Sequence, residues 1–301
     1  MEQNLEILKE CPICSSHDLG KGLEIKDFFL SQEKFGTSKC KNCGFVFTNP
    51  RPKEADLGRY YKSEAYISHS NSNKGLFGFL YQTIRNYTLK KKYKKVSAIS
   101  NGKHILDIGC ATGQLLNEFN QHNWHCTGIE PDAEAREFAT KEYGLNVLEI
   151  DRMNELEDQS FHIISMWHVL EHVANLKERM VQLKRLISPD GYLFIALPNI
   201  ESWDAQYYQE YWAGLDVPRH LFHFSKDDVK LLFSQYDFEI VDIQGMKFDS
   251  YYVSLLSEKY KKNPLYLFSA FFKGWYSNLK ANKKIANHSS LLYILKPKQK
   301  Y

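Results

Sequence analysis

Four cysteines near the N-terminus form two pairs with the spacing of a metal site. Cys11 and Cys14 are separated by two residues, and so are Cys40 and Cys43. Each pair can place two thiolates on one side of a turn, and two pairs make the tetrahedral four-sulfur site that suits zinc. A redox pair needs only one such motif, and two disulfides suit a secreted chain. We therefore expect a small zinc ribbon over residues 1–52, with the metal supplying much of its folding free energy.

A second stretch suits a ligand that carries hydroxyl groups. An apolar segment ends in Asp107-Ile108-Gly109-Cys110-Ala111-Thr112-Gly113, whose glycines permit positive φ and close approach of a ligand to the main chain. Helical spacing begins at Gln114, so free N–H groups of that first turn would face the ligand. Glu130 follows the next apolar segment, and a carboxylate about twenty residues after the loop suits a ribose diol. Ala111 replaces the second glycine of the dinucleotide fingerprint, so we expect a nucleoside and not a pyrophosphate.

The residues at 107–113, together with Gly-Ile-Glu-Pro-Asp at 128–132, resemble the first two motifs of class I S-adenosylmethionine-dependent methyltransferases. Leu-Glu-His-Val at 170–173 is also similar to a pattern of the small-molecule enzymes in this class. The resemblance covers 101–297 and implies a Rossmann-like α/β sheet that is mostly parallel, with an antiparallel last strand. In such enzymes the glycine loop holds the methionine end of S-adenosylmethionine and the acid holds its ribose. The cofactor-binding residues implied here are Asp107, Gly109, Cys110, Ala111, Gly113, Glu130, Asp151, Trp167 and His168.

The elements that position these residues follow from the apolar pattern of the chain. A turn signal at 188–191 precedes the fifth expected strand, and a capping box at 225–228 begins a late helix. Ligands of open α/β sheets bind beyond the carboxyl ends of the strands, so Glu130, His168 and Asn199 should open onto one crevice. The expected core strands are 104–108, 124–129, 146–150, 161–165, 192–197, 238–246 and 290–295.

Histidines close to this crevice are candidates for removing a proton from the acceptor. On a helix, His168 and His172 would share a face, with Glu171 beside them. The sequence His-x-x-Glu-His at 168–172 also matches the inverted zinc-protease motif. A protease site lies within a long helix, whereas these residues follow a strand, so we favour the methyltransferase interpretation. His220 belongs to Pro-Arg-His-Leu-x-x-Phe at 218–224, which resembles the substrate-side loop of methyltransferases that act on sugars and other small metabolites. We expect His220 to be the general base, with His168 and His172 as alternatives; a structural loop with buried histidines is the other interpretation.

The flanking segments complete the site in this interpretation. Residues 53–100 form a helical linker that covers the cofactor, 101–246 the methyltransferase core, 247–289 a helical aromatic insertion, and 290–301 the final core strand and tail. The aromatic side chains of the insertion can cover the substrate, contact a lipid carrier or pack on the core. Substrate contacts are expected from Tyr61, Tyr66, Asn199, Arg219 and His223.

Composition limits the partners that the chain can have. Its 301 residues include 39 basic and 36 acidic side chains, and the net charge of +3 gives no global field for nucleic acid. A basic run, Lys90–Lys95, is either a solvated helix face or a contact for a phosphate or acidic substrate. The chain shows neither a secretory leader nor an apolar stretch long enough to span a bilayer, and its cysteine usage suits a reducing compartment. We therefore expect a cytoplasmic protein.

A four-cysteine ribbon joined to this core further resembles the zinc-ribbon methyltransferases, including those that C-methylate deoxysugars carried on nucleotides. The expected function is methyl transfer from S-adenosylmethionine to a small-molecule acceptor, with zinc in a structural role. A nucleotide-linked sugar, or another cell-envelope or secondary-metabolite precursor, is the expected acceptor. An RNA methyltransferase with a zinc finger and a non-catalytic zinc-ribbon adaptor are the alternatives. The sequence indicates neither the acceptor atom nor the oligomeric state.

Overall fold

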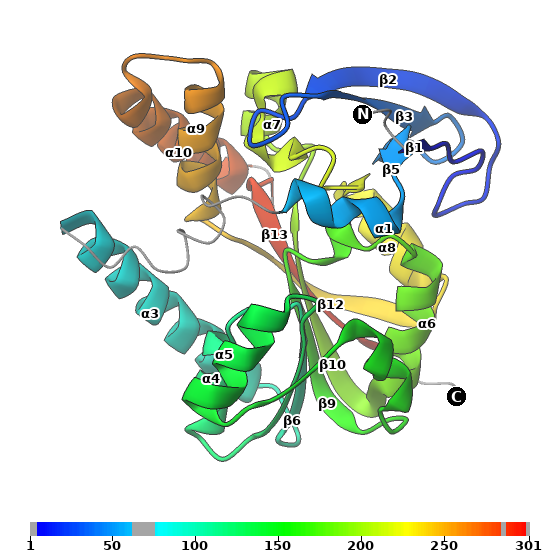
Figure 1. Ribbon diagram of the computed structural model, residues 1–301, viewed down its shortest axis with the longest axis vertical. Coiled ribbons are helices and arrows are strands. Elements are labelled where there is room, and N and C mark those ends of the chain that lie inside the picture. The colour runs from blue at the N-terminus through cyan, green and yellow to red at the C-terminus, as the bar shows by residue number, and fades with distance from the viewer. Residues whose placement is uncertain (1–4, 62–75, 284–286, 299–301) are drawn as a thin grey trace.

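The centre of the molecule is a seven-stranded sheet with helices on both faces (Figure 1). The computed structural model describes residues 5–61, 76–283 and 287–298. The strand order is β12-β13-β10-β9-β6-β7-β8, in which β13 is antiparallel to both neighbours and the other pairs are parallel. The expected Rossmann-like sheet with an antiparallel last strand is therefore confirmed. Its strands are β6 (His104–Ile108), β7 (His125–Ile129), β8 (Asn146–Leu148), β9 (Phe161–Trp167), β10 (Ile187–Pro198), β12 (Phe238–Gly245) and β13 (Ser290–Pro297).

Helices cover both faces because the central strands are apolar on both sides. One face is covered by α3 (Leu76–Ser97), α4 (Gln114–Asn120) and α5 (Ala133–Tyr143), and the other by α6 (Leu176–Leu186) and α8 (Lys226–Ser234) (Figure 1). In α6, apolar residues recur at helical spacing and are at most 3% exposed, which buries one side of the helix on the sheet. These residues are Leu176, Met180, Leu183 and Leu186.

Some element boundaries differ from the expectation. The residues at 188–191 do not form a turn between helix and strand, because β10 begins at Ile187, directly after α6. The register of β10 against β9 shifts between Ile187 and Tyr192, so the turn-forming residues lie in an irregular part of the strand. The third strand ends at Leu148, and Asp151 lies beyond it in the 3₁₀ helix η2 (Ile150–Glu155).

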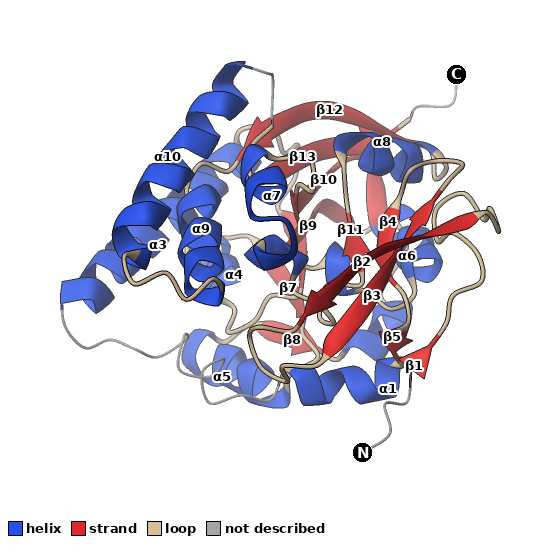
Figure 2. Ribbon diagram, turned by 90° about the horizontal axis from the view of Figure 1, so that it is seen from above, coloured by secondary structure: helices blue, strands red, loops and turns tan. Residues whose placement is uncertain are grey.

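The N-terminal segment is attached to the core through a second sheet. β2 (Leu19–Lys26), β3 (Lys34–Cys40) and β4 (Val46–Thr48) are antiparallel neighbours, and β11 (Phe222–His223) pairs with β4 as the fourth strand (Figure 2). The ring of Phe45 lies 5.9 Å from that of Phe222. Strand pairing and aromatic packing therefore hold this segment on the core. A further two-stranded sheet consists of β1 (Leu5–Glu6) and β5 (Arg51–Pro52).

The chain after β12 forms a helical hairpin. α9 (Asp249–Tyr260) and α10 (Tyr266–Lys283) pack against each other before β13 (Figures 1 and 2). Among the described residues, no helix is both long enough and apolar enough to cross a membrane. The shorter helices are α1 (Glu54–Leu57), η1 (Gly58–Tyr60), η3 (Leu170–His172), α7 (Trp203–Tyr208), η4 (Gln209–Tyr211) and η5 (Ala213–Leu215).

Candidate functional site

The glycine loop between β6 and α4 has the backbone conformation that its sequence requires. Gly109, Ala111 and Gly113 have positive φ, at 73°, 48° and 76°. A Cβ on Gly109 would lie 2.5 Å from Cγ2 of Val169, and one on Gly113 would lie 2.7 Å from Cδ1 of Leu145. Neither glycine can therefore be replaced without displacing a neighbour. Cys110 is buried within the loop, whereas Ala111 is exposed at its tip.

Two carboxyl groups lie beside this loop. Asp107 in β6 is 3% exposed and accepts a hydrogen bond from the hydroxyl of Ser165. Burial raises the pKa of Asp107 to about 7, although the bond from Ser165 opposes the shift. Glu130, directly after β7, accepts the N–H of Ala111 at 2.9 Å and that of Asp132 at 3.0 Å. Burial also raises the pKa of Glu130. A ligand that brings a positive charge or hydrogen-bond donors would stabilise the ionised form of both acids.

Trp167, the last residue of β9, lies beside a cation. Nζ of Lys92, from α3, is 3.7 Å from the centre of the Trp167 ring. Burial lowers the pKa of Lys92 to about 8, against the attraction of Asp107 and Asp249. The indole Nε1 of Trp167 is buried and has no hydrogen-bond partner among the described residues. Asp151, in contrast, is exposed in η2.

His168 does not lie on the helix that would place it beside His172. It follows β9 with a φ of 57°, and only Leu170–His172 form a short 3₁₀ turn. Nε2 of His168 is 3.0 Å from Oδ2 of Asp249, and Nδ1 is 3.5 Å from Oε1 of Glu171. Burial would lower the pKa of His168, but the two carboxylates outweigh it and raise the pKa well above its usual value. The two carboxylates therefore favour the protonated form of His168, which makes it a poor proton acceptor.

His172 and His220 form an adjacent pair, with ring centres 4.5 Å apart. Nδ1 of His172 is 3.0 Å from the carbonyl oxygen of Arg219, and Nδ1 of His220 is 2.9 Å from that of Gly214. A carbonyl oxygen only accepts, so Nδ1 of His220 carries the proton and its Nε2 keeps the lone pair. Burial, together with the nearby His220, lowers the pKa of His172 to about 4. The hydroxyl of Tyr61 lies 2.9 Å from Nδ1 of His172.

Glu171 is a fully buried acid beside this pair, at 0% exposure. Apart from the ion pair with His168, its two carboxylate oxygens have no hydrogen-bond partner among the described residues. Glu171, His172 and His220 each offer one ligand atom, and these atoms lie within 4.8 Å of one another. The zinc-protease interpretation requires His168 and His172 as joint ligands, and this group contains His220 in place of His168. That interpretation is therefore not supported.

Comparison with known proteins agrees with this geometry. A family model described as a methyltransferase domain matches residues 81–243, more than half of the chain. The chain belongs to this methyltransferase family.

Curated relatives of this methyltransferase include the ubiquinone biosynthesis O-methyltransferase of Actinobacillus pleuropneumoniae serotype 5b (strain L20). It is 33% identical over 109 residues, which are 33% of this chain and 47% of the relative. The Rickettsia prowazekii (strain Madrid E) enzyme of the same name is 28% identical over 200 residues, or 61% of this chain and 78% of the relative. The chain spans about half the length of several curated relatives that it matches.

Solved structures share the fold of this methyltransferase. Haemonchus contortus phosphoethanolamine N-methyltransferase 2, in complex with S-adenosyl-L-methionine, has a TM-score of 0.55 at 13% identity, covering 93% of this chain and 69% of that chain. A putative sarcosine dimethylglycine methyltransferase from Galdieria sulphuraria has a TM-score of 0.51 at 12% identity, covering 73% and 87%. At such identities the likeness shows the fold alone. It agrees with the class I methyltransferase fold expected from the sequence.

Several residues expected to contact the substrate of this methyltransferase have structural partners. The amide of Asn199, at 1% exposure, donates to Oδ1 of Asn287 and to the carbonyl of His288, both at 3.1 Å. His223 is 3% exposed, and its Nε2 lies 3.2 Å from Oγ1 of Thr48, across the β4–β11 pairing. These two residues thus hold segments of the chain together. Tyr66 lies outside the described residues.

Arg219 has no donor left for a substrate. Its Nη2 donates to Oδ1 of Asp27 at 2.8 Å and to Oδ1 of Asp216 at 2.6 Å. Its Nη1 donates to Oδ2 of Asp27 and to the carbonyl of Tyr60, and its Nε donates to Oδ2 of Asp216. Five bonds use all five N–H groups of the guanidinium. Arg219 therefore ties the segment after β2 to the loop that carries His220.

Replacing Arg219 with alanine should lower the free energy of unfolding by about 3–5 kcal/mol, because Asp27 would be left buried without its counter-charge. Urea denaturation measures this loss. Arg152→Ala is the control, since Arg152 pairs with Glu155 at the surface and its loss should change the free energy of unfolding by at most about 1 kcal/mol. A folded, equally stable Arg219→Ala variant with only a raised KM for the acceptor would return Arg219 to the substrate site.

Three residues near the site were not among the expected ones. Asp249 begins α9, and three residues separate it from the end of β12. Glu130, in contrast, directly follows its strand, so the sequence gives a weaker signal for Asp249. Glu171 is predicted from the sequence only as a neighbour of two histidines. Lys92 lies within a basic run, and nothing in the sequence distinguishes it from the neighbouring lysines.

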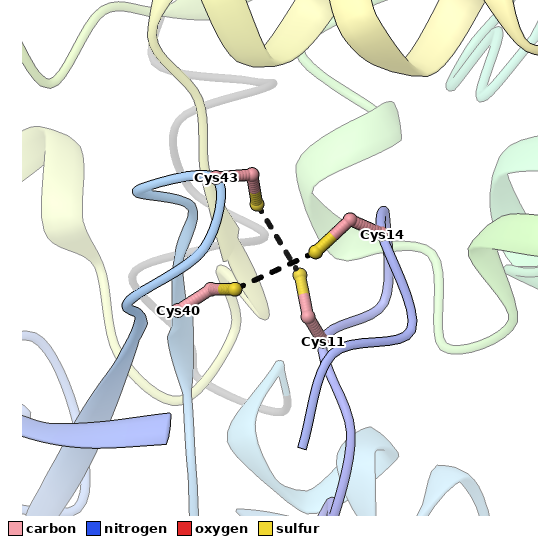
Figure 3. Close-up of side chains that lie close together, drawn as sticks. All are labelled: Cys11, Cys14, Cys40 and Cys43. Carbon is pink, nitrogen blue, oxygen red and sulfur yellow. Dashed lines mark hydrogen bonds between the residues drawn. The ribbon is translucent and has the colours of Figure 1, made fainter. Parts of the chain in front are cut away.

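The four cysteines converge at one point (Figure 3). Their sulfurs lie 3.6 Å apart for Cys11 and Cys43 and 3.5 Å apart for Cys14 and Cys40. In a tetrahedral zinc site with bonds of about 2.3 Å, sulfurs lie about 3.8 Å apart. All four ligand atoms lie within 4.8 Å of one another, so the arrangement fits a single zinc ion.

Proposed function

We propose that this chain transfers a methyl group from S-adenosylmethionine to a small-molecule acceptor held between the glycine loop and the His172–His220 pair. The observation that carries the proposal is the position of these two parts. The glycine loop follows β6, and His172 follows β9, which is the neighbouring strand of the sheet. Ligands of open α/β sheets bind at this carboxyl edge.

The residues around the loop offer the groups that S-adenosylmethionine needs. Glu130 can accept the ribose hydroxyls, Asp107 can attract the ammonium group, and Lys92 can attract the carboxylate of the methionine part. The indole N–H of Trp167, which lacks a hydrogen-bond partner among the described residues, offers one more donor. When bound, S-adenosylmethionine supplies a methyl group on a positively charged sulfur, which is a good leaving group.

The protein must position the acceptor, exclude water and take up one proton. His220 is suited to the proton, because its Nδ1 donates to Gly214 and its Nε2 accepts no hydrogen bond from any described residue. Oδ2 of Asp216 lies 4.0 Å from this Nε2 and would stabilise the imidazolium that forms when the proton is taken up. Burial and the nearby His220 lower the pKa of His172, so His172 is poorly suited to take up a proton near neutral pH. We therefore assign proton removal to His220 and the positioning of the acceptor to His172 and Tyr61. His168 is less suited as the base, because the carboxylates of Glu171 and Asp249 stabilise its protonated form.

The acceptor class rests on two observations. The curated relatives are named ubiquinone biosynthesis O-methyltransferases, which supports a small molecule. The four-cysteine ribbon, which we propose holds one structural zinc ion, favours nucleotide-linked sugars as the first acceptors to assay. An RNA acceptor would instead require binding that falls steeply with salt concentration. Methyl incorporation into RNA, with none into small molecules, would contradict the proposed class.

Calorimetric titration with S-adenosylmethionine and S-adenosylhomocysteine tests the cofactor site. The wild type should bind both with micromolar affinity. The Gly109→Arg variant should lose this binding, because a side chain at that position meets Val169 and obstructs the loop. Gly144→Arg is the matched control: Gly144 also has a positive φ, at 65°, but no atom lies within 4 Å of an added Cβ.

Circular dichroism must show that both glycine variants are folded. If Gly109→Arg misfolds, Glu130→Gln is the second variant, since it removes the charge at the ribose position and keeps the size of the side chain. Absence of S-adenosylmethionine binding to the folded, zinc-loaded wild type would contradict the proposed function.

A further inference from the structure

The α9–α10 hairpin carries a group of large apolar side chains that are 39–68% exposed. Leu265 and Phe268 are each 68% exposed, and Phe271 is 58% exposed. Soluble monomers seldom expose such a contiguous group unless it binds something. We call this group the hairpin face. Its members are Leu265, Leu267, Phe268, Phe271, Phe272, Trp275, Tyr276 and Leu279.

The opposite side of α10 explains why these residues point outward. Small residues recur there at helical spacing and are buried against α9 and its surroundings. A Cβ on Gly274 would lie 2.9 Å from Cα of Tyr251, and the hydroxyl of Ser250 donates to the Gly274 carbonyl at 3.1 Å. The two helices are therefore too close for a large side chain between them. The buried small residues of α10 are Ala270, Gly274, Ser277 and Ala281.

The exposed charges of the α9–α10 hairpin itself are of one sign. Between 247 and 282 the acidic residues are Asp249, which pairs with His168, and Glu258, which is 3% exposed. Neither offers an exposed carboxylate. Lys273 lies over the ring of Tyr207 at 4.2 Å and Lys280 over that of Tyr276 at 5.2 Å, so cations border the aromatic side chains. The lysines of this segment are Lys247, Lys259, Lys261, Lys262, Lys273 and Lys280.

We propose that the hairpin face docks on the surface of an anionic lipid bilayer. Phenylalanine, tryptophan and leucine enter the boundary between headgroups and acyl chains, and the bordering lysines meet the lipid phosphates. A second copy of the chain is a poorer occupant, because a two-fold contact would bring the same lysine-rich border against itself. α10 lies along the surface in this arrangement and does not cross the bilayer. The docking does not depend on the proposed methyl transfer.

Vesicle co-sedimentation of the full chain tests the docking. Wild type should sediment with phosphatidylcholine vesicles that contain phosphatidylglycerol, and much less with phosphatidylcholine alone. The double variant Phe268→Ser/Phe271→Ser should bind the anionic vesicles at least about tenfold more weakly, since two partly inserted rings are lost. Lys261→Glu/Lys262→Glu should weaken binding to the anionic vesicles only.

The matched control is Leu23→Ser/Val181→Ser, which removes two apolar side chains exposed elsewhere, at 55% and 57%. This control should sediment like the wild type, and all variants should still bind S-adenosylmethionine if the cofactor site is correctly assigned. Failure of the wild type to sediment with anionic vesicles would overturn the docking. So would a wild-type dimer in analytical ultracentrifugation that Phe268→Ser/Phe271→Ser converts to a monomer, because the hairpin face would then be a contact between copies.

Discussion

Replacing His220 with alanine should slow methyl transfer roughly 10²–10⁴-fold and leave the affinity for S-adenosylmethionine nearly unchanged. The variant removes Nε2 of His220, which we propose as the proton acceptor. In the wild type, Nδ1 donates to the carbonyl of Gly214 and leaves the lone pair on Nε2. His172 can take over only in part, because its lowered pKa gives it little driving force to accept a proton. Single-turnover rates on the identified acceptor, with calorimetry for the cofactor, separate the two effects.

His125→Ala provides the control for this experiment. His125 begins β7 at the opposite edge of the sheet and is exposed, so its loss should alter neither quantity. An unchanged rate for His220→Ala would remove His220 from the mechanism. A fall in cofactor affinity with an unchanged single-turnover rate at saturation would place His220 at the cofactor site.

The glycine loop and the sheet could be predicted from the sequence because their signals are local. Gly109 and Gly113 adopt positive φ where the motif requires it, and Glu130 lies beside the loop because a parallel neighbour strand brings it there. The cysteine pairs are equally local, since each C-x-x-C fixes two sulfurs on one turn. Spacing along the chain is enough in such cases, because the backbone geometry of one turn or one strand decides the outcome.

The roles of the polar residues around the acceptor could not be predicted, because distant partners decide them. Arginine is a residue type typical of anion-binding sites. Arg219, however, donates to Asp27, which is far away in the sequence. Asn199 likewise donates to the carbonyl of His288. His168 and His172 do not share a helix face, because β9 continues to Trp167. A sequence motif specifies which side chains are available, whereas burial and long-range pairing decide which of them remain free.

Removing zinc should destabilise more than the ribbon that holds it. Isolated zinc fingers gain about 10–16 kcal/mol from the metal and are unfolded without it. Here Cys11, Cys40 and Phe45 belong to the same buried cluster as Leu170 and Phe222, so the loss of the metal should extend into the core. We expect chelation, or Cys40→Ser, to lower the melting temperature by roughly 5 °C or more. Elemental analysis and thermal denaturation of the same samples measure the effect.

Cys126→Ser is the matched control, because Cys126 is a free cysteine of β7 outside the four-sulfur cluster. It should keep one zinc ion per chain and nearly the wild-type melting temperature. A wild type without zinc, or a Cys40→Ser variant as stable as the control, would contradict the zinc assignment. Two zinc ions per chain would indicate that Glu171, His172 and His220 also hold a metal, and the lone pair of His220 would then be occupied and unable to serve as the base. The zinc count therefore tests the ribbon and the proposed mechanism in one measurement.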